Sequence, residues 1–367
     1  MLVAGGIAWS LTRSGPTSLG GAARGPQAIT RITAALLPPI AQTSVRPANA
    51  DKAGAVVQVT ATTKKATAEV TLQVRRGSEW ADLDTMRLDE DGAASFTAPT
   101  ERPDSTSPLR VVSAQDPGVR SVTVRPNAWR LAFEDQFDGA ALDQVKWSYR
   151  QLGLLNPGRT KSESSVDAVR VENGALKLST LENPARPGYY LNGHVSTEAS
   201  YSFTYGVAAA RVKFQKPRGM HGAFWLQSPA YGAVPGDAKK SGSEIDTAEY
   251  FGATYPDGGL ATVTYYKDEQ GSSVKAGGML PEASDAIAEM GDAWWKKYHV
   301  FSVEWTPEAY IFRIDGMETF RQTQNISGVS QVLILSLLSS DWELPDLDTS
   351  QLPADMKVDW IRVWQQL

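Results

Sequence analysis

The sequence contains no cysteine, only three histidines and no apolar run of membrane-spanning length. Without cysteine, disulfides and Cys-ligated metal centres are excluded. No stretch reaches the roughly eighteen consecutive apolar residues that a membrane-spanning helix needs, so we expect no membrane span. No His/Glu cluster has the spacing of a catalytic metal site, so we expect no cofactor in catalysis. Helical periodicity is scarce as well, since only residues 281–290 have the pattern of a helix.

Charge and size narrow the class of protein further. The net charge of −5 and a pI near 5.4 argue against a nucleic-acid or anionic-membrane partner. A length of 367 residues suits two domains, and 42% hydrophobic residues can build a sizeable core. Residues 207–214 and 310–314 alternate apolar with polar positions between Gly and Pro turns, which is typical of a β-sandwich. The apolar run 332–338 is interpreted as a buried strand.

Residues 51–126 have the strand density of a small immunoglobulin-like or fibronectin-like β-sandwich, with turns rich in Asp, Gly and Pro. Two interpretations of this module are open. It is a carbohydrate-binding module with Trp80 as a stacking platform, or a spacer, which we favour because a single Trp on a strand usually belongs to the core. The stretches that alternate are residues 55–61, 69–74, 93–97, 109–113 and 121–124.

Residues 1–50 are low in charge and rich in Ala, Gly, Pro, Ser and Thr, and show no packed element. An apolar stretch at 32–41 follows Arg31 and precedes Ala48-Asn49-Ala50, which resembles a leader cleavage site before residue 51. Prolines 38 and 39 interrupt that stretch, so the leader would be atypical. We expect residues 1–50 to be a secretory leader, with a disordered N-terminal segment as the alternative.

The most informative stretch is residues 241–252, Ser-Gly-Ser-Glu-Ile-Asp-Thr-Ala-Glu-Tyr-Phe-Gly. It packs three carboxylates, Glu244, Asp246 and Glu249, into six positions among apolar and aromatic neighbours. On a strand, Glu244 and Asp246 share a face and Glu249 falls on the other one. A one-residue β-bulge between Asp246 and Glu249 would bring all three to one face. The alternative is a chance acidic cluster on a solvated strand.

Retaining glycoside hydrolysis is the chemistry that needs such a set. One carboxylate must be ionised to attack the anomeric carbon, and another must hold a proton for the leaving oxygen. Retaining enzymes place the two groups about 5–5.5 Å apart. An ionised Glu244 would raise the pKa of Glu249 and keep it protonated, while Asp246 could hydrogen-bond the nucleophile.

The pattern Glu-Ile-Asp-x-x-Glu-Tyr at 244–250 resembles the catalytic signature of glycoside hydrolase family 16, in the bulged form of its laminarinases, agarases and carrageenases. Other stretches resemble segments of the same family in the same order, so the resemblance covers about residues 127–367. These stretches are residues 131–147, 171–178, 205–213, 222–226, 299–307, 314–316 and 358–364.

The resemblance implies an all-β fold: a concanavalin-like β-jelly-roll of two stacked antiparallel sheets, with a sugar cleft on the concave one. It implies Glu244 as nucleophile, Asp246 as its assistant and Glu249 as acid/base. We therefore expect a secreted bacterial endo-glycosidase, a monomer with a polysaccharide as its partner, that hydrolyses β-1,3-glucan with retention. A β-1,3/1,4-glucan or galactan substrate, a transglycosylase, and a non-catalytic glycan-binding protein stay open. Polymeric glycans lie outside the cell, which is the argument for secretion.

The resemblance also suggests residues that bind substrate. Trp225 matches a family position that lines the cleft and stacks on sugar. His221 would face the donor sugar or be a hydrogen-bonded turn histidine, and Trp342 follows the apolar stretch 332–338 in a loop that differs from the family pattern. Four further residues sit where the family places cleft-lining side chains: Tyr190, Asn192, His194 and Tyr201.

One structural metal site is suggested in the same way. Many family members hold Ca²⁺ on the convex side, through the Asp of the closing strand and backbone carbonyls. Asp359 matches that Asp, and Gly174 could offer a carbonyl. Calcium takes six to eight oxygen ligands, so one carboxylate with carbonyls and waters would bind it weakly.

Overall fold

The structure is a computed structural model that describes residues 29–41, 54–63, 68–98, 107–124, 129–153 and 157–367. The described chain forms two compact units, one within residues 29–130 and the other within 131–365. Among the residues described, no helix is long and apolar enough to cross a membrane.

The smaller unit is built from two three-stranded antiparallel sheets. Buried side chains from both sheets, including Val57 and Phe96 from one and Val70 and Val111 from the other, form a single hydrophobic cluster. The unit is therefore a small β-sandwich, and its assignment to an immunoglobulin-like or fibronectin-like type stays a prediction. The sheets are β1 (Arg31–Ala41), β2 (Gly54–Thr62) and β5 (Ala93–Ala98), and β4 (Glu79–Arg87), β3 (Glu69–Arg76) and β6 (Leu109–Ser113).

Strand β1 corrects the expectation that residues 1–50 contain no packed element. It pairs with β2 from Arg31 to Ala41, and its Ile32 and Leu36 belong to the shared core. The pairing register shifts on both sides of Pro39, because proline cannot donate to the ladder and disturbs the alternation. In the sequence, Pro38 and Pro39 gave the stretch the appearance of an interrupted leader core. Residues 1–28 and 42–50, with the Ala48-Asn49-Ala50 sequence, lie outside the described residues.

Two other details of this unit differ from the sequence-based expectation. Residues 121–124 contribute only an isolated bridge between Leu109 and Val124. Strand β4, which carries Trp80, was not among the alternating stretches, although Trp80 was expected on a strand. Trp80 is half-buried, and the guanidinium of Arg110 lies 4.1 Å from its ring centroid. Because that cation covers one ring face, this face is not open for stacking on a sugar.

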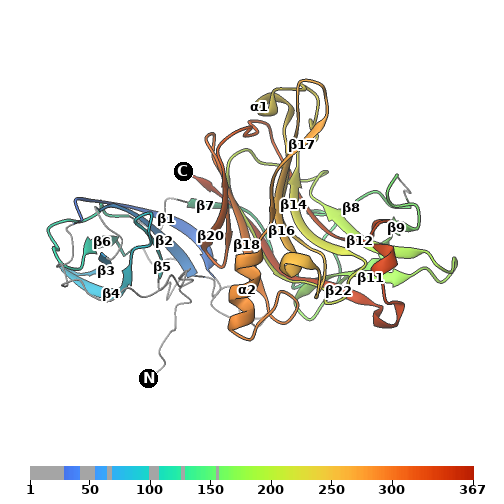
Figure 1. Cartoon of the computed structure of the whole chain (residues 1–367), viewed down its shortest axis with the longest axis horizontal. Helices are drawn as coiled ribbons and strands as arrows, with labels where there is room; N and C mark the ends of the chain where they lie inside the picture. The colour runs from blue at the N-terminus through green and yellow to red at the C-terminus, as the bar shows by residue number, and fades with distance from the viewer. Residues whose placement is uncertain (1–28, 42–53, 64–67, 99–106, 125–128, 154–156) are drawn as a thin grey trace, which may run out of the picture. The chain divides into compact units, whose positions relative to one another are not determined.

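The larger unit is one curled antiparallel sheet whose two halves stack as layers (Figure 1). One half has the order β17-β16-β15-β14-β21-β12, and the other has β11-β22-β13-β18-β19-β20. Strand β12 joins them, since it pairs with β11 through residues 190–192 and with β21 through residues 193–196. This jelly-roll confirms the expected fold class.

The bounds of the strands in this order are β17 (Ser273–Met279), β16 (Leu260–Lys267), β15 (Glu244–Tyr250), β14 (His221–Gln227), β21 (Val332–Leu338), β12 (Tyr190–Ser196), β11 (Ala175–Glu182), β22 (Ala354–Gln366), β13 (Gly206–Lys213), β18 (His299–Trp305), β19 (Tyr310–Ile314) and β20 (Met317–Gln322). Beside this path lie β7 (Trp129–Asp135), β8 (Ser148–Tyr149), β9 (Ser162–Ser164) and β10 (Val169–Glu172), with the helices α1 (Ala238–Ser241) and α2 (Pro281–Glu289). Helix α2 confirms the helix expected at residues 281–290.

The core of the larger unit lies between the two layers. Phe214, at the end of β13, packs on Tyr250 of β15 and on Phe301 of β18 with ring centroids 5.4 and 5.2 Å apart. All residues of β21 are buried, which confirms residues 332–338 as a strand inside the sheet. Because β12, β21, β14 and β15 are successive neighbours, their outward faces form one continuous floor.

We expect Leu36→Asp to lower the free energy of unfolding by about 3 kcal/mol, because it buries an unpaired charge in the core of the small sandwich. Ala35→Asp, at an exposed neighbouring position, should change it by less than about 0.5 kcal/mol. Urea unfolding of the purified chain, with its N-terminus read by mass spectrometry, checks this. A mature chain that starts at residue 51 would contradict the assignment of β1.

Candidate active site

A β-bulge on β15 gathers the three carboxylates. Asp246 pairs with Val263 of β16, and Glu249 pairs with Ala261, so three steps on β15 match two on β16. The extra residue turns Glu249 to the face that already holds Glu244 and Asp246. The bulge inferred from the sequence spacing is confirmed.

Burial dominates the electrostatics of this face. Asp246 is only 4% exposed, and burial raises its pKa well above the ordinary value, with the charges of Glu249 and Glu244 raising it further. Burial likewise raises the pKa of Glu244 and of Glu249. The charge of Glu244 adds to the shift at Glu249, as expected from the sequence, although burial is the larger cause. Like charges this close do not all ionise together.

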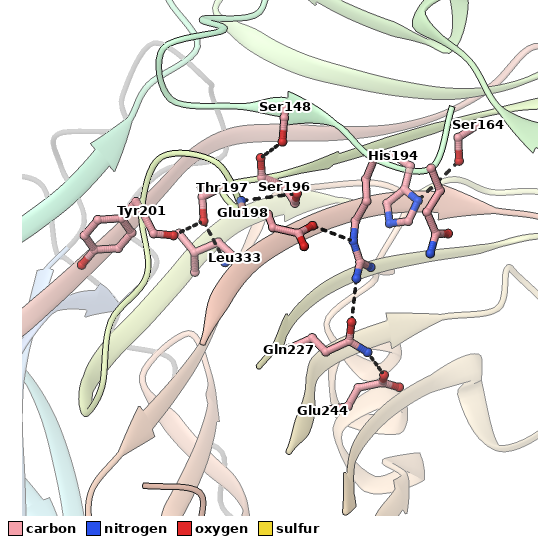
Figure 2. Close-up of polar contacts among 12 residues, drawn as sticks. Ser148, Ser164, His194, Ser196, Thr197, Glu198, Tyr201, Gln227, Glu244 and Leu333 are labelled. Atoms are coloured by element: carbon pink, nitrogen blue, oxygen red, sulfur yellow. Dashed lines mark hydrogen bonds and ion pairs between the residues drawn. The ribbon is translucent and has the colours of Figure 1, made fainter. Parts of the chain in front are cut away.

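Glu244 receives a hydrogen bond that favours its charged form. Gln227, opposite it on β14, donates from Nε2 to Glu244 Oε2 at 2.6 Å, and accepts at Oε1 from Arg150 Nη2 at 2.6 Å (Figure 2). Because arginine can only donate, the amide of Gln227 is oriented with its NH₂ toward the carboxylate. Gln227, Arg150 and Lys267 lower the pKa of Glu244 against the effect of burial.

His221, the first residue of β14, acts on Glu249. Its Nδ1 lies 2.8 Å from Oε2 of the buried Glu343, which also accepts from the backbone N–H of Ser340. Burial lowers the pKa of His221, but the charges of Glu343 and Glu249 outweigh it, so the pKa is raised. A charged His221 in turn lowers the pKa of Glu249 against the effect of burial.

A cavity of about 370 Å³ opens beside this face. Trp225 forms part of its wall and is fixed by a 3.1 Å hydrogen bond from its Nε1 to Ser336 Oγ. Its ring stacks on His194, with centroids 6.2 Å apart. Of the predicted substrate-binding residues, the cavity brings together four: Trp225, His221, His194 and Trp342, which is 59% exposed.

Known proteins resemble this chain in sequence and in fold. The sequence profile described as "Glycosyl hydrolases family 16" matches residues 158–362, more than half of the chain. The chain belongs to glycosyl hydrolase family 16. It is 24% identical over 262 residues to the keratan-sulfate endo-1,4-beta-galactosidase of Sphingobacterium multivorum, covering 67% of this chain and 58% of that protein. It is also 24% identical to the glucan endo-1,3-beta-glucosidase A1 of Niallia circulans, covering 64% and 38%.

The chain therefore spans less than two thirds of the length of these two relatives. Among solved structures, the endo-beta-1,3(4)-glucanase SCLam is similar with a TM-score of 0.52 at 22% identity, covering 66% of this chain and 93% of that one. The laminarinase from Rhodothermus marinus has a TM-score of 0.52 at 22% identity, covering 65% and 98%. These similarities show the family 16 jelly-roll fold.

Three predicted cleft residues do not line the cavity. Asn192 is fully buried, where it donates to Thr180 Oγ1 and accepts from the backbone N–H of Ser339, so it holds the chain that leads to Trp342. Tyr201 stacks on Phe133, with centroids 4.7 Å apart, on the side of Figure 2 opposite His194. Tyr190 is half-buried at the start of β12.

The cavity also has wall residues that the sequence did not indicate. Arg150, Arg159 and Gln227 line it, and Gln227 connects it to Glu244. Arg150 follows the short strand β8, and Arg159 lies in the loop before β9, where no motif marks either residue. Gln227 could have been found from its strand register, since it lies on the same face of β14 as Trp225.

The residues suggested for calcium do not fit that ion. Asp359 is the extra residue at a register shift of β22 against β13, and its carboxylate forms a buried ion pair with Arg211 Nη1 at 2.5 Å. Gly174 lies in the turn between β10 and β11. A guanidinium on the carboxylate supplies the compensating charge that a cation would bring. Within the described ranges, no cluster of three or more potential metal ligands is found.

We expect Asp359→Ala to lower the free energy of unfolding by about 3–5 kcal/mol, because it leaves the buried Arg211 charge without this carboxylate. The matched control Glu318→Ala breaks an exposed pair with Arg321 and should cost no more than about 1 kcal/mol. Urea denaturation measures both. EDTA should leave the melting temperature of the wild type unchanged, and a large drop would restore the calcium assignment.

Proposed function

We propose that the protein is a retaining endo-glycosidase that cleaves β-linked polysaccharide through a covalent glycosyl-enzyme intermediate. The observation that carries the proposal is the bulged β15, which sets Glu244, Asp246 and Glu249 on one buried face. The adjoining cavity, with Trp225 in its wall, offers an aromatic surface for a sugar ring. Family membership supports the same chemistry.

The surroundings of the carboxylates support different roles for them. Glu244 has a hydrogen-bond donor and two cations that favour its ionised form, which suits a nucleophile. Burial is the largest effect on Glu249 and raises its pKa, which favours the protonated form that an acid catalyst needs. The negative charges of Glu244 and Glu343 add to this, while the cations His221 and Lys275 oppose it. Burial raises the pKa of Asp246 well above its usual value, which favours a protonated carboxyl that would donate a hydrogen bond to the nucleophile.

The reaction then follows two displacements. Glu244 attacks the anomeric carbon, while Glu249 protonates the glycosidic oxygen of the departing chain, which leaves as an alcohol. In the second step Glu249, now ionised, removes a proton from water as the water oxygen attacks the same carbon and releases Glu244. A sugar hydroxyl in place of water would make the protein a transglycosylase.

The relatives support two kinds of polysaccharide as the substrate. The sequence favours β-1,3-glucan, in line with the relative named glucan endo-1,3-beta-glucosidase A1. A galactan is supported by the keratan-sulfate endo-1,4-beta-galactosidase and by the beta-porphyranase E of Zobellia galactanivorans, 24% identical over 253 residues. Secretion and a monomeric state remain part of the proposal, as export would bring the enzyme to its polymer.

Reducing-end release from laminarin, barley glucan, lichenan, agarose, porphyran and keratan sulfate tests the proposal. We expect wild type to release reducing ends from at least one polymer, and Glu244→Gln to be slower by about a thousandfold or more, because an amide cannot form the glycosyl ester. Binding without release from any polymer, also with acceptor sugars present, would leave only a binding role.

Glu249→Gln should slow polysaccharide cleavage far more than cleavage of an aryl glycoside with a good leaving group, because such a group departs without a proton. Rates on both substrates compare the two cases. Glu318→Gln is the control, since this carboxylate lies at an exposed position on β20, and it should leave both rates unchanged. Equal losses on both substrates for Glu249→Gln would remove its role as the acid.

Gln227→Met should shift the acidic limb of the pH–rate profile to higher pH. The hydrogen bond from Gln227 lowers the pKa of Glu244, so its loss lets that pKa rise, and the nucleophile then ionises only at higher pH. The profile of kcat/KM against pH reads this directly. A lower rate with an unmoved acidic limb would mean that Gln227 only positions the strand.

A further inference from the structure

The cavity wall next to the carboxylates is strongly cationic in character. Arg150, Arg159 and His221 contribute positive charge to it, whereas none of the described residues that line it is Asp or Glu. The protein as a whole carries a net charge of −5. The side chains that line the cavity are therefore basic in an acidic chain, with Glu343 paired to His221 and Glu198 beside Arg150.

Hydrogen bonds between two loops hold Arg159 in this wall. Asp341 accepts hydrogen bonds from the backbone N–H and the hydroxyl of Thr160 at 2.9 and 2.8 Å, and its own N–H donates to Gly158 O at 2.7 Å. Arg159 is 8% exposed and donates from Nη2 to Gln151 Oε1 at 2.8 Å. Its guanidinium is thus placed before any ligand arrives.

The cationic groups repel one another. Burial lowers the pKa of Arg159, and the charge of Arg150 lowers it further. Burial lowers the pKa of His194 well below its usual value, and the charges of Arg150, Arg159 and His221 add to that shift. The positive charges of Arg150, Arg159 and His221 thus all act on this ring. An anion in the cavity would relieve this repulsion.

His194 also offers an unused polar atom. Its ring is buried, its Nδ1 lies 3.4 Å from Ser164 Oγ, and its Nε2 has no hydrogen-bond partner among the residues described. Buried ring nitrogens are normally paired. A ligand oxygen in the cavity that His194 lines would satisfy this atom.

Arg150 alone would not require a ligand. It supports Gln227, and its Nε lies 3.8 Å from Glu198 Oε2, a carboxylate that is 54% exposed (Figure 2). Arg159 has no place in that chain to Glu244, yet it lies buried in the same wall. A substitution of Arg159 therefore tests ligand recognition without removing a hydrogen bond from the chain that leads to Glu244.

We propose that this cavity is a subsite for a sugar that carries an anionic substituent, either a sulfate ester or a uronate carboxylate. The proposal rests on the proposed function in taking the cavity as part of a glycan cleft. Trp225 would stack on the sugar ring, and the fork of Arg159 would bind two oxygens of the anion. A neutral β-1,3-glucan has no such group, so the proposal favours an anionic glycan over β-1,3-glucan as the substrate.

Isothermal titration with matched glycans tests the subsite. The full chain carrying Glu244→Gln, which prevents turnover, is titrated with keratan sulfate oligosaccharides and their desulfated form. It is also titrated with β-linked glucuronan oligosaccharides and their carboxyl-reduced form. Arg159→Gln removes the charge and Arg159→Lys keeps it, each checked for an unchanged unfolding midpoint. Arg321→Gln, at an exposed position on β20, is the control.

We expect one anionic glycan to bind at least about tenfold more tightly than its neutral counterpart, and the pair that shows this identifies sulfate or carboxylate. Arg159→Gln should remove most of that preference. Arg159→Lys keeps the charge but loses the fork and should keep part of it, whereas Arg321→Gln should keep all of it. Raising the salt concentration should weaken it without any substitution. Equal affinity within both pairs, including no binding at all, would overturn the subsite. It would also be overturned if Arg159→Gln weakened the binding of charged and neutral glycans equally.

Wild-type turnover separates this inference from the proposed function. Tight binding of an anionic glycan that the wild type never cleaves would support the subsite and contradict hydrolysis. Release from neutral glucans together with equal affinity within the pairs would support hydrolysis and overturn the subsite.

Discussion

The whole site depends on one extra residue in β15. Between Asp246 and Glu249 the strand takes three steps against two on β16, and without that mismatch Glu249 would point into the layer behind. The neighbouring layer holds Phe214 and Phe301 against Tyr250, so a carboxylate directed there would be buried among aromatic rings. The register of the sheet thus decides whether the acid–base residues share a face.

Burying three acids on one face has a free-energy cost, which the surrounding strands offset. At one end of the face Gln227 and Arg150 favour negative charge on Glu244. At the other, burial and the charge of Glu244 raise the pKa of Glu249, and the charge of His221, which is paired with Glu343, lowers it. This asymmetry supports different protonation of two glutamates that lie on the same strand.

The larger unit was predictable because its signals are local. The spacing of Glu244, Asp246 and Glu249 required a bulge, and the apolar stretch that became β21 could be recognised from its residues. Arg150 and Arg159 could not be recognised, because they lie in segments without a motif and reach the cavity only through tertiary folding. Asn192 and Tyr201 occupy family positions, but sequence position does not tell which way a side chain faces once loops repack.

The N-terminal region shows a second limit of prediction from the sequence. An apolar stretch with two prolines has the composition of a leader core, and only the partner strand β2 reveals β1 as part of a sheet. Pairing partners distant in sequence carry that information, as they do for Asp359. Its carboxylate could be matched to a family position, but Arg211 approaches it from another strand.

The amide of Gln227 has a consequence for reactivity. A guanidinium bound directly to Glu244 would withdraw electron density from the oxygen that must form a new bond, and a less basic carboxylate is a poorer nucleophile. By standing between Arg150 and Glu244, the amide transmits orientation while it weakens the electrostatic pull. The end of β14 thereby keeps the arginine one side chain away from the attacking oxygen, whose lone pair stays available.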